Sequence, residues 1–423
     1  MTLRVLLLGS GGREAALAWA LSRSARCAHL FAAPGNPGLE RWADCLPELN
    51  PLDVEAVVAC CRERHIDLVF VGPEQPLVAG LVDELAARGI PAFGPGRLAA
   101  ELEGSKAWAK AFMARHGIPS ADFRAFHDLA PALSFLEQAP WPVVLKASGL
   151  AAGKGVVLPD SLDEARQVLT GMLDGSAFGE AGSTVVIEER MSGPELSVFA
   201  LCDGTAGWIL GSARDHKRVG EGDTGPNTGG MGAVAPSPLA TPELLDRVRH
   251  EILEPVLAGM ASEGRPYRGI LYLGLMLTES GPRVIEFNCR LGDPETQALL
   301  PLLELDLLDA AWRVARGERL PEGPEPACRP GAAVCVVLAA AGYPGPTRRG
   351  DEILGLADFG PADPLVFLAG VERGPEGRLL TAGGRVLGLT ALGASVEEAR
   401  RRALAAAERV SFAGRHYRKD IGA

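Results

Sequence analysis

The chain of 423 residues is 47% hydrophobic and 22% charged, a composition ordinary for a globular protein of two to four domains. Its formal net charge of −11 argues against a nucleic-acid backbone or an anionic membrane surface as the main partner, so any anion-binding site must be local. The sequence shows neither an apolar stretch of membrane-spanning length nor a signal peptide, which predicts a cytoplasmic protein.

Residues 3 to 103 alternate short apolar runs with helical patterns, which is typical of a parallel, doubly wound sheet. We predict strands at residues 5–8, 29–33, 67–71 and 90–93, and helices that begin at Arg13, Leu52 and Leu77. The adjacent Cys60 and Cys61 fall in one of these helices. Because no C-x-x-C pair occurs among the eight cysteines, neither a disulfide framework nor a zinc site is indicated.

A glycine turn, G-S-G-G-R-E, follows the first predicted strand and opens the first helix. Backbone N–H groups and the helix dipole at such a turn can hold a phosphate. A dinucleotide fingerprint would need glycine in place of Glu14 and an acidic residue at the end of the second strand, so NAD is disfavoured. Two interpretations stay open: a tight turn that only glycine can make, or a mononucleotide phosphate site.

A helix over residues 105–116, closed by Gly117 and Pro119, places a domain boundary near residue 103. The pattern beyond it indicates an α+β unit. We predict strands at 143–146, 156–158, 184–189, 196–201, 271–277 and 284–288, and helices from Asp128, Ser161 and Pro242. Residues 212–236 show no periodicity and predict a long loop, which either orders over a ligand or is a disordered solvent-exposed segment.

Lysine is rare in this chain, with six lysines against 36 arginines. Four lie in or beside Gly-, Ser- or Asp-rich segments: Lys106, Lys146, Lys154 and Lys217. A compact ammonium group suits a single phosphate oxygen, although an arginine-rich base composition alone leaves a few lysines at random positions. Lys146 and Lys154 bracket a glycine-rich loop. Such a loop can close over a triphosphate while the ammonium groups neutralise its oxygens, and the alternative is a plain hairpin turn with solvated lysines.

The run E-F-N-C-R alternates polar and apolar residues, so Glu286, Asn288 and Arg290 share one face of a predicted strand. Two oxygen-bearing side chains at this spacing suit Mg²⁺, which combines a few protein ligands with phosphate oxygens and water. A structural salt bridge between Glu286 and Arg290 is the alternative interpretation. Asp293 follows at the start of the next predicted helix, where it either caps the helix or contacts a substrate.

The Pro- and Gly-rich stretch 320–331 is typical of a linker, and it leads into a mostly β region with a helix from Ser395. The predicted fold class is α/β and α+β multidomain. An N-terminal doubly wound domain covers residues 1–103, a central domain 104–325 and a small C-terminal β-rich domain 326–423. In the central domain, a small lid subdomain covers about 120–190 and a larger subdomain about 191–325.

Five longer motifs, spread over the chain, resemble one known family. They are L-E-G-S-K at 102–106, L-A-A-G-K-G-V at 150–156, D-H-K-R-V-G at 215–220, D-T-G-P-N-T-G-G-M-G-A at 223–233 and E-F-N-C-R-L-G-D-P-E-T-Q at 286–297. The closing R-K-D-I-G belongs to the same pattern. These motifs resemble the phosphoribosylamine-glycine ligases, also called glycinamide ribonucleotide synthetases, of the ATP-grasp superfamily. The resemblance implies an ATP-grasp fold of two α+β subdomains in the central domain.

The resemblance also implies a reaction and its site residues. Glycine takes the γ-phosphoryl group of ATP to give glycyl phosphate, and 5-phosphoribosylamine then attacks it to give glycinamide ribonucleotide in de novo purine biosynthesis. The implied cofactor is Mg²⁺ or Mn²⁺, held by Glu286 and Asn288. The implied catalytic residues are Lys154, Arg290 and Asp293. The implied ATP-binding residues are Lys106, Lys146, Gly149, Gly153, Lys154, Gly155, Glu188, Glu189, Met191 and Glu195. The implied residues for glycine and phosphoribosylamine are Gly9, Gly11, Gly12, Asn36, Gly72, Pro73, Glu74, Asp215, His216, Lys217, Arg290 and Asp293.

The chain departs from the family's pattern at two positions. Ala15 stands where members commonly have His, which removes one phosphoribosyl contact, and Ser148 stands where they commonly have Asp, which changes the charge of the phosphate loop. The predicted strand 271–277 also lacks the metal-binding acid of many ATP-grasp enzymes.

Three rival functions stay open at this point. The first is another ATP-grasp enzyme, either a carboxylate-amine ligase or an enzyme that acts on bicarbonate and a purine intermediate. The second is a nicotinamide-dependent oxidoreductase, and the third is a protein that binds a nucleotide as a sensor without turning it over. We expect a monomer whose partners are ATP, glycine and phosphoribosylamine, the last arriving by diffusion or by transient handover from the enzyme that makes it.

Overall fold

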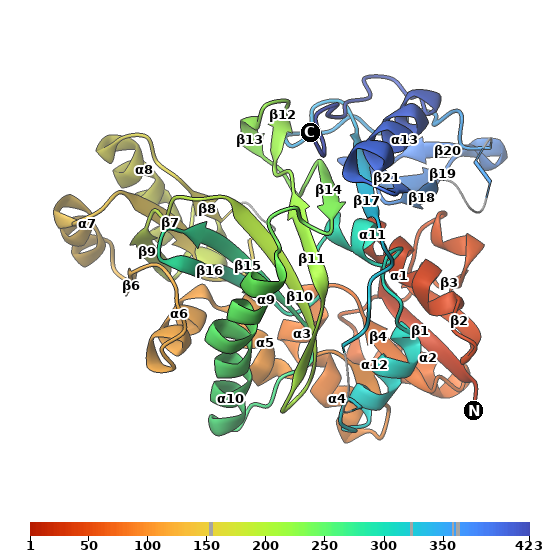
Figure 1. Ribbon diagram of the computed structural model, residues 1–423, viewed down its shortest axis with the longest axis horizontal. Helices are drawn as coiled ribbons and strands as arrows, with labels where there is room; N and C mark the ends of the chain where they lie inside the picture. Colours follow the sequence, from red (N-terminus) through yellow and green to blue (C-terminus); the bar gives the residue numbers. More distant parts are fainter. Residues whose placement is uncertain (152–154, 322–324, 358, 361–363) are drawn as a thin grey trace.

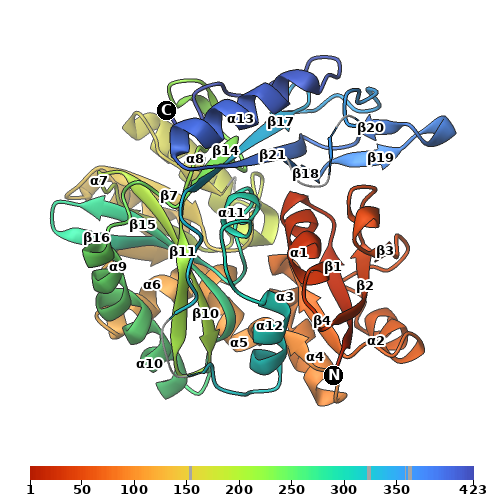
Figure 2. The same ribbon diagram turned by 45° about the vertical axis from the view of Figure 1, so that its right-hand side comes forward.

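The computed structural model describes residues 1–151, 155–321, 325–357, 359–360 and 364–423. The N-terminal region and the small sheet of the central region flank a long sheet whose last strands belong to the C-terminal region, as Figures 1 and 2 show. Among the described residues, no helix has the length and apolar character needed to cross a membrane.

The N-terminal region is a parallel sheet of β1 (Leu3–Gly9), β2 (Cys27–Pro34), β3 (Asp44–Cys45), β4 (Leu68–Val71) and β5 (Ala92–Phe93) in the order β3-β2-β1-β4-β5. Its helices are α1 (Gly12–Ser22), α2 (Val54–Glu63), α3 (Glu74–Ala79) and α4 (Leu81–Ala87). The side chains of β1 are buried on both faces, as a central parallel strand requires. The predicted doubly wound sheet is confirmed, and the ends of β1 and β4 lie side by side through the Leu8–Val71 pair.

Two helices, α5 (Arg97–Gly104) and α6 (Lys106–Arg115), lead into a small antiparallel sheet of the central region. Its strands are β6 (Phe123–Phe126), β7 (Val143–Ala147), β8 (Val156–Val157) and β9 (Val185–Glu189), in the order β6-β9-β7-β8. Helices α7 (Leu129–Gln138) and α8 (Leu162–Leu173) share a core with Leu145, Val185 and Ile187 on one face of this sheet. Because strand side chains alternate, Lys146 and Glu188 extend from the opposite face.

The long sheet has the order β16-β15-β10-β11-β14-β17-β21-β18. Its strands are β10 (Glu195–Asp203), β11 (Gly207–Asp215), β14 (Gly232–Ala235), β15 (Arg268–Thr278), β16 (Gly281–Asn288), β17 (Ala332–Ala339), β18 (Leu365–Leu368) and β21 (Arg385–Gly393). Its helices are α9 (Pro242–Val248), α10 (Glu254–Ser262), α11 (Glu295–Leu299), α12 (Leu307–Ala315) and α13 (Val396–Arg409). A hairpin of β19 (Val371–Arg373) and β20 (Leu379–Thr381) extends from the C-terminal part. Strand β14 of the central region pairs with β17, so this sheet continues into the C-terminal region.

The prediction of an irregular loop over residues 212–236 is wrong. Strand β11 occupies the first part and β14 the last, and β12 (Arg218–Gly220) pairs with β13 (Thr224–Asn227) as a hairpin between them. The hairpin carries several glycines but no alternating apolar face, and its strand residues are largely exposed. The periodicity of the sequence therefore gave no sign of these strands.

Candidate active site

The small sheet and the edge of the long sheet contact each other at the centre of the molecule. The Lys146 ammonium on β7 donates to the backbone oxygen of Ile285 on β16, at 3.1 Å. Ser120 forms an isolated bridge to Val284, next to the same position. Side chains that extend from β7 and β9 therefore meet those that extend from β16.

The loop after β7 docks on the first turn of α6. The backbone N–H of Lys106 donates to the oxygen of Ser148 at 2.9 Å, and that of Ala107 donates to the Ser148 hydroxyl at 3.0 Å. The Lys106 ammonium reaches the backbone oxygen of Gly149 at 3.2 Å. Lys106, Lys146 and Gly149 thus converge, and the Ser148 hydroxyl satisfies an N–H group in the first turn of α6.

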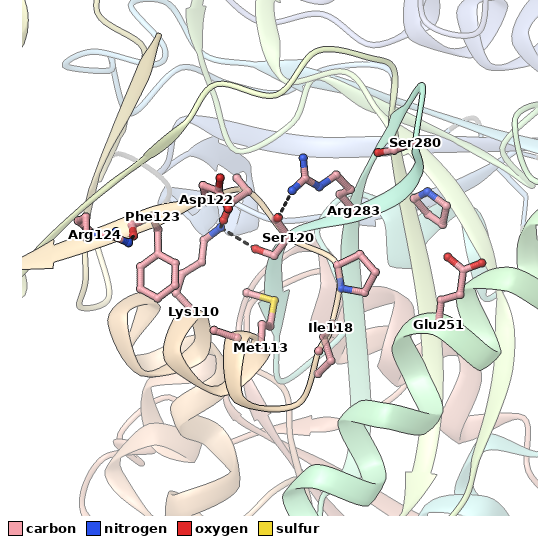
Figure 3. Close-up of a pocket in the computed structure, with 15 residues that line it drawn as sticks. Lys110, Met113, Ile118, Ser120, Asp122, Phe123, Arg124, Glu251, Ser280 and Arg283 are labelled. Atoms are coloured by element: carbon pink, nitrogen blue, oxygen red, sulfur yellow. Dashed lines mark hydrogen bonds between the residues drawn. The ribbon is translucent and has the colours of Figure 1, made fainter. Parts of the chain in front are cut away.

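A buried charge triad lies behind this loop. The Glu188 carboxylate pairs with the Lys146 ammonium through Oε1 and with the Lys110 ammonium through Oε2, the latter at 2.7 Å. All three side chains are at most 5% exposed. Lys110 also donates to the Ser120 hydroxyl at 2.7 Å and to the Ala121 oxygen at 3.1 Å, as Figure 3 shows for Ser120. Two ammonium groups therefore share one carboxylate, which leaves positive charge at Lys146 for an anion.

If the Lys146 ammonium binds a phosphate of ATP, as the resemblance implies, Lys110→Met should raise the KM for ATP about tenfold. Without Lys110, the Glu188 carboxylate has one cation left, so it holds the Lys146 ammonium more strongly and leaves it less available to phosphate. The measurement is steady-state kinetics at varied ATP. The double variant Lys110→Met/Glu188→Gln is the control, because it removes the carboxylate as well and should bring KM back toward the wild-type value. A double variant no better than Lys110→Met would contradict this explanation.

Glu286 on β16 lies close to three lysine ammonium groups. Burial raises the pKa of its carboxyl, but the ammonium groups of Lys217, Lys146 and Lys106 outweigh burial and hold it below the ordinary value. Within the described residues, the Glu286 carboxylate makes no hydrogen bond or ion pair, so it is ionised and available to a ligand. Lys217 pairs with Glu195 at 2.6 Å, which brings β10 to the same place.

Arg290 links the N-terminal sheet to the central region. Its guanidinium pairs with Glu74 at 3.2 Å, where the turn of Gly72 and Pro73 leads into α3, and with Glu103 on α5 at 2.7 Å. It also donates to the Asn288 side-chain oxygen at 3.3 Å. The predicted alternative of a structural Glu286–Arg290 salt bridge is absent from the described residues, because Arg290 is committed to Glu74 and Glu103.

Asp293 lies against the glycine turn of the N-terminal sheet. Its carboxylate accepts from Gln297 at 2.8 Å, pairs with Arg385 at 3.3 Å and lies 3.4 Å from the backbone nitrogen of Arg13. Burial raises the pKa of this carboxyl, but Arg385 and Arg13 bring it below the ordinary value. A Cβ atom built on Gly11 would lie 3.4 Å from the same carboxylate, and α11 has no side-chain cap, so Asp293 faces the turn and does not cap the helix.

Glu14 fills the crevice between the ends of β1 and β4. Its carboxylate accepts from the Gly11 N–H at 2.8 Å, and a Cβ built on Gly9 or Gly72 would lie within 2.5 Å of the Glu14 side chain. Gly9 has a φ of +121°. The position that glycine holds in a dinucleotide fingerprint is thus occupied by a carboxylate, which agrees with the prediction against NAD.

Asn36 ties the loops of the N-terminal sheet together. Its amide donates to the oxygens of Ser10 at 2.6 Å and Leu368 at 3.3 Å, and its oxygen accepts from the Gly38 N–H at 2.6 Å. The side chain therefore holds the glycine turn against the next loop and against β18.

Two acidic side chains, Asp215 and Glu295, lie close to Lys217. Burial and the neighbouring Glu295 raise the pKa of Asp215 well above its usual range, and its Oδ1 has no hydrogen-bond partner in the described part of the chain. Burial, with Arg214 and Arg418 nearby, lowers the pKa of His216 to about 4, so this imidazole is neutral at neutral pH. The Asp215 carboxyl is thus a buried polar group, and a Cβ atom built on Gly230 would lie 2.6 Å from its Oδ1.

The remaining predicted residues lie at the edge of the two sheets or outside the described residues. Glu189 ends β9 and pairs with Arg283 at 3.5 Å, and the half-buried Met191 follows in the segment that leads to Glu195. Gly155 accepts from the Ala147 N–H at 2.8 Å. Gly153 and Lys154 lie outside the described residues, so the structure gives no position for the predicted catalytic lysine.

A surface groove of about 700 Å³ lies beside this site, between the segment after α6 and strand β16. Lys110, Ser120 and Arg283 line it, and Figure 3 shows Lys110 and Arg283 both reaching Ser120. None of the predicted site residues that the structure describes lies in this groove. The groove therefore reaches the charge triad only through Lys110, and it is separate from the place where the lysine ammonium groups surround Glu286.

Sequence reasoning missed several residues of the site: Arg13, Glu14 as a filler of the crevice, Glu103, Lys110, Glu295, Gln297 and Arg385. Lys110 was within reach, because it is one of only six lysines and lies one helical turn after Lys106. Glu295 and Gln297 stand inside the quoted motif at 286–297.

Three family models match nearly all of the chain. The phosphoribosylglycinamide synthetase N domain matches residues 3–103, the ATP-grasp (A) domain of the same synthetase 104–296 and its C domain 333–423. A phosphoribosylamine–glycine ligase of Caulobacter vibrioides is 50% identical over 421 residues, which cover 99% of this chain and 98% of the relative. That of Pasteurella multocida is 48% identical over 423 residues, with 99% and 97% covered.

Solved structures agree with these matches. The crystal structure of a phosphoribosylamine–glycine ligase from Thermotoga maritima superposes with a TM-score of 0.85 and 37% identity, covering 99% of this chain and 100% of that one. A biotin carboxylase domain of the 2-oxoglutarate carboxylase from Hydrogenobacter thermophilus superposes with a TM-score of 0.76 at 20% identity, with 99% and 92% covered. The latter shares the fold.

Proposed function

The chain belongs to the phosphoribosylglycinamide synthetase family, and on that premise we propose how its residues carry out the family's reaction. The enzyme is an ATP-dependent carbon–nitrogen ligase that joins glycine to phosphoribosylamine and forms glycinamide ribonucleotide in purine biosynthesis. The prediction of the family, of its ATP-grasp fold and of this activity is confirmed. The observation that supports the residue roles is the convergence of Lys106, Lys146 and Lys217 on the Glu286 carboxylate.

In the first step, we propose that a carboxylate oxygen of glycine attacks the γ-phosphorus of ATP and that the P–O bond to ADP breaks. This transfer has little covalent chemistry for the protein to perform, so it depends on positioning and charge neutralisation. We propose that the ammonium groups of Lys106 and Lys146 neutralise the phosphate oxygens. Lys154, which is not among the described residues, is expected to contribute to this neutralisation. We propose that adenosine lies along Glu189, Met191 and Glu195.

Magnesium or manganese fits the residues that the structure brings together. Glu286 offers an ionised carboxylate free of ion pairs within the described residues, and Asn288 offers an amide oxygen whose contact with Arg290 is long at 3.3 Å. In the part of the chain that the structure describes, no cluster of three acidic, histidine or cysteine side chains could hold a metal. Phosphate oxygens and water would complete the coordination, as Mg²⁺ commonly uses them. When bound, the ion would neutralise charge on the phosphates.

In the second step, the amino nitrogen of phosphoribosylamine attacks the acyl carbon of glycyl phosphate. A C–N bond forms, the C–O bond to phosphate breaks, and the nitrogen releases a proton. We propose that the glycine turn, Asn36 and Glu74 bind the phosphoribosyl group, and that Arg290, Asp293 and Asp215 surround glycine. Two contacts between the central and N-terminal regions support this assignment. Arg290 pairs with Glu74, and Asp293 lies against Gly11 of the glycine turn.

An assay of ADP release tests the function. With ATP, glycine and freshly prepared phosphoribosylamine, we expect steady ADP formation that stops when any one of the three is omitted. Bicarbonate in place of glycine should give no ADP above background. ADP release that needs bicarbonate, or nucleotide binding without turnover under any combination, would contradict the assignment.

Several finer features of this enzyme remain predictions. We propose the domain boundaries at residues 103 and 325, a monomeric state and a cytoplasmic location, each as stated from the sequence. We also propose that phosphoribosylamine arrives by diffusion or by transient handover from the enzyme that makes it.

A further inference from the structure

Arg418 is buried to an extent that is rare for arginine. Its side chain is 1% exposed. The guanidinium donates to the Arg218 backbone oxygen at 3.0 Å, and it pairs with Asp223 at 2.7 Å and with Asp420 at 2.6 Å. Two of these three partners belong to the β12–β13 hairpin. Arg418 therefore joins the segment after α13 to that hairpin.

The segment 416–422 makes further contacts with the same hairpin. His416 bonds to the Val219 backbone oxygen at 2.8 Å, and the Gly222 N–H donates to Asp420 at 2.8 Å. The Lys419 N–H donates to Glu221 at 3.1 Å. Figure 1 shows the hairpin beside the C-terminal end of the described chain. The hairpin, which has little apolar surface to hold it, is thus fixed by polar contacts from this segment.

The hairpin is directly connected to the site. Lys217 immediately precedes the Arg218 carbonyl that Arg418 holds, and its own carbonyl accepts from Thr228 at 2.7 Å on the far side of the hairpin. The Lys217 ammonium pairs with Glu195 and acts on the Glu286 carboxylate. A shift of the hairpin would therefore move an ammonium group that interacts with Glu195 and Glu286.

We propose that Arg418 is a positioning residue, which fixes the β12–β13 hairpin so that the Lys217 ammonium points into the site between the two sheets. This inference rests on the proposed function of that site. It gives a role to Arg418 in the closing R-K-D-I-G motif. Positioning errors of about 1 Å can reduce turnover about 100-fold, so the expected effect of losing Arg418 is large.

The test is a double-mutant cycle on turnover with Arg418→Met, Lys217→Met and the double variant. If Arg418 acts through Lys217, each single variant should lower kcat about 10- to 100-fold, and the double variant should be no slower than Lys217→Met. Multiplied losses in the double variant would overturn the proposal. Arg401→Met, on an exposed position of α13, is the matched control and should keep wild-type kcat.

A second measurement keeps the proposal testable if Arg418→Met fails to fold. Asp223→Asn removes the negative charge of one partner of Arg418, at a half-exposed position whose φ of +54° asparagine tolerates. Amide exchange of residues 218–228 should be faster in this variant, with a parallel loss of kcat, while exchange in β1 stays unchanged. Unchanged exchange and unchanged kcat would overturn the proposal. A wild-type enzyme without glycine-dependent ADP release would instead contradict the proposed function.

Discussion

Glu286→Gln should lower kcat about 10²- to 10³-fold and raise the Mg²⁺ concentration needed for half-maximal activity. The carboxylate stands among three ammonium groups and has no ion pair within the described residues, which suits a metal ligand better than a structural anion. An amide of the same shape keeps the packing but removes the charge. Since the lysines remain, binding of ATP should hold or tighten while turnover falls.

The measurement is kcat as a function of Mg²⁺, with nucleotide binding followed separately. Glu279→Gln is the matched control, because Glu279 is an exposed carboxylate in the turn between β15 and β16. It should leave both quantities unchanged. A Glu286→Gln enzyme with wild-type metal dependence would refute the ligand assignment.

Arg290→Met should abolish most activity and also lower the free energy of unfolding by about 3–5 kcal/mol at neutral pH. The substitution leaves Glu74 and Glu103 without their main cation, and Glu103 is almost fully buried. Burial already raises the pKa of Glu103 above its ordinary value of 4.5 although Arg290 opposes it, so the variant's Glu103 should take up a proton more readily.

This loss of stability has a defined pH dependence. A carboxyl whose pKa is higher in the folded state favours folding most below its unfolded pKa, and that contribution is lost as pH rises toward the folded value. The deficit of Arg290→Met should therefore grow from about pH 5 to about pH 8. Chemical denaturation at both pH values measures it. Arg290→Met/Glu103→Gln, which removes the buried charge, should recover part of the stability at pH 8, and no recovery there would contradict the account.

Much of the fold was predictable because its signals are local. The strands of the N-terminal sheet are short apolar runs, and the helices predicted from Ser161 and Ser395 begin there, with the serine side chains accepting from the backbone N–H groups of Glu164 and Glu398. Strand β11 was missed although it pairs with the preceding strand β10, because both its faces are partly buried. Its sequence therefore lacks the alternation of apolar and polar residues that marks a half-exposed strand.

The candidate site divides in the same way. Lys106, Lys146 and Glu286 stand in motifs whose residue types already indicate phosphate and metal chemistry, and the structure brings them together. Lys110 stands in none of these motifs, and Arg418 stands in the closing R-K-D-I-G motif, whose residue types alone indicate no chemistry. The surroundings of each are set by a carboxylate that folding brings from elsewhere in the chain. Residues that position others are therefore recognisable only once their partners are known.

The most direct test of the account is a crystal structure with a non-hydrolysable ATP analogue and Mn²⁺. We expect the triphosphate between the small sheet and β16, with Lys106 and Lys146 against its oxygens and an anomalous Mn²⁺ peak bound by Glu286 and Asn288. A nucleotide seated in the groove lined by Lys110 and Arg283, or a metal remote from Glu286, would contradict it.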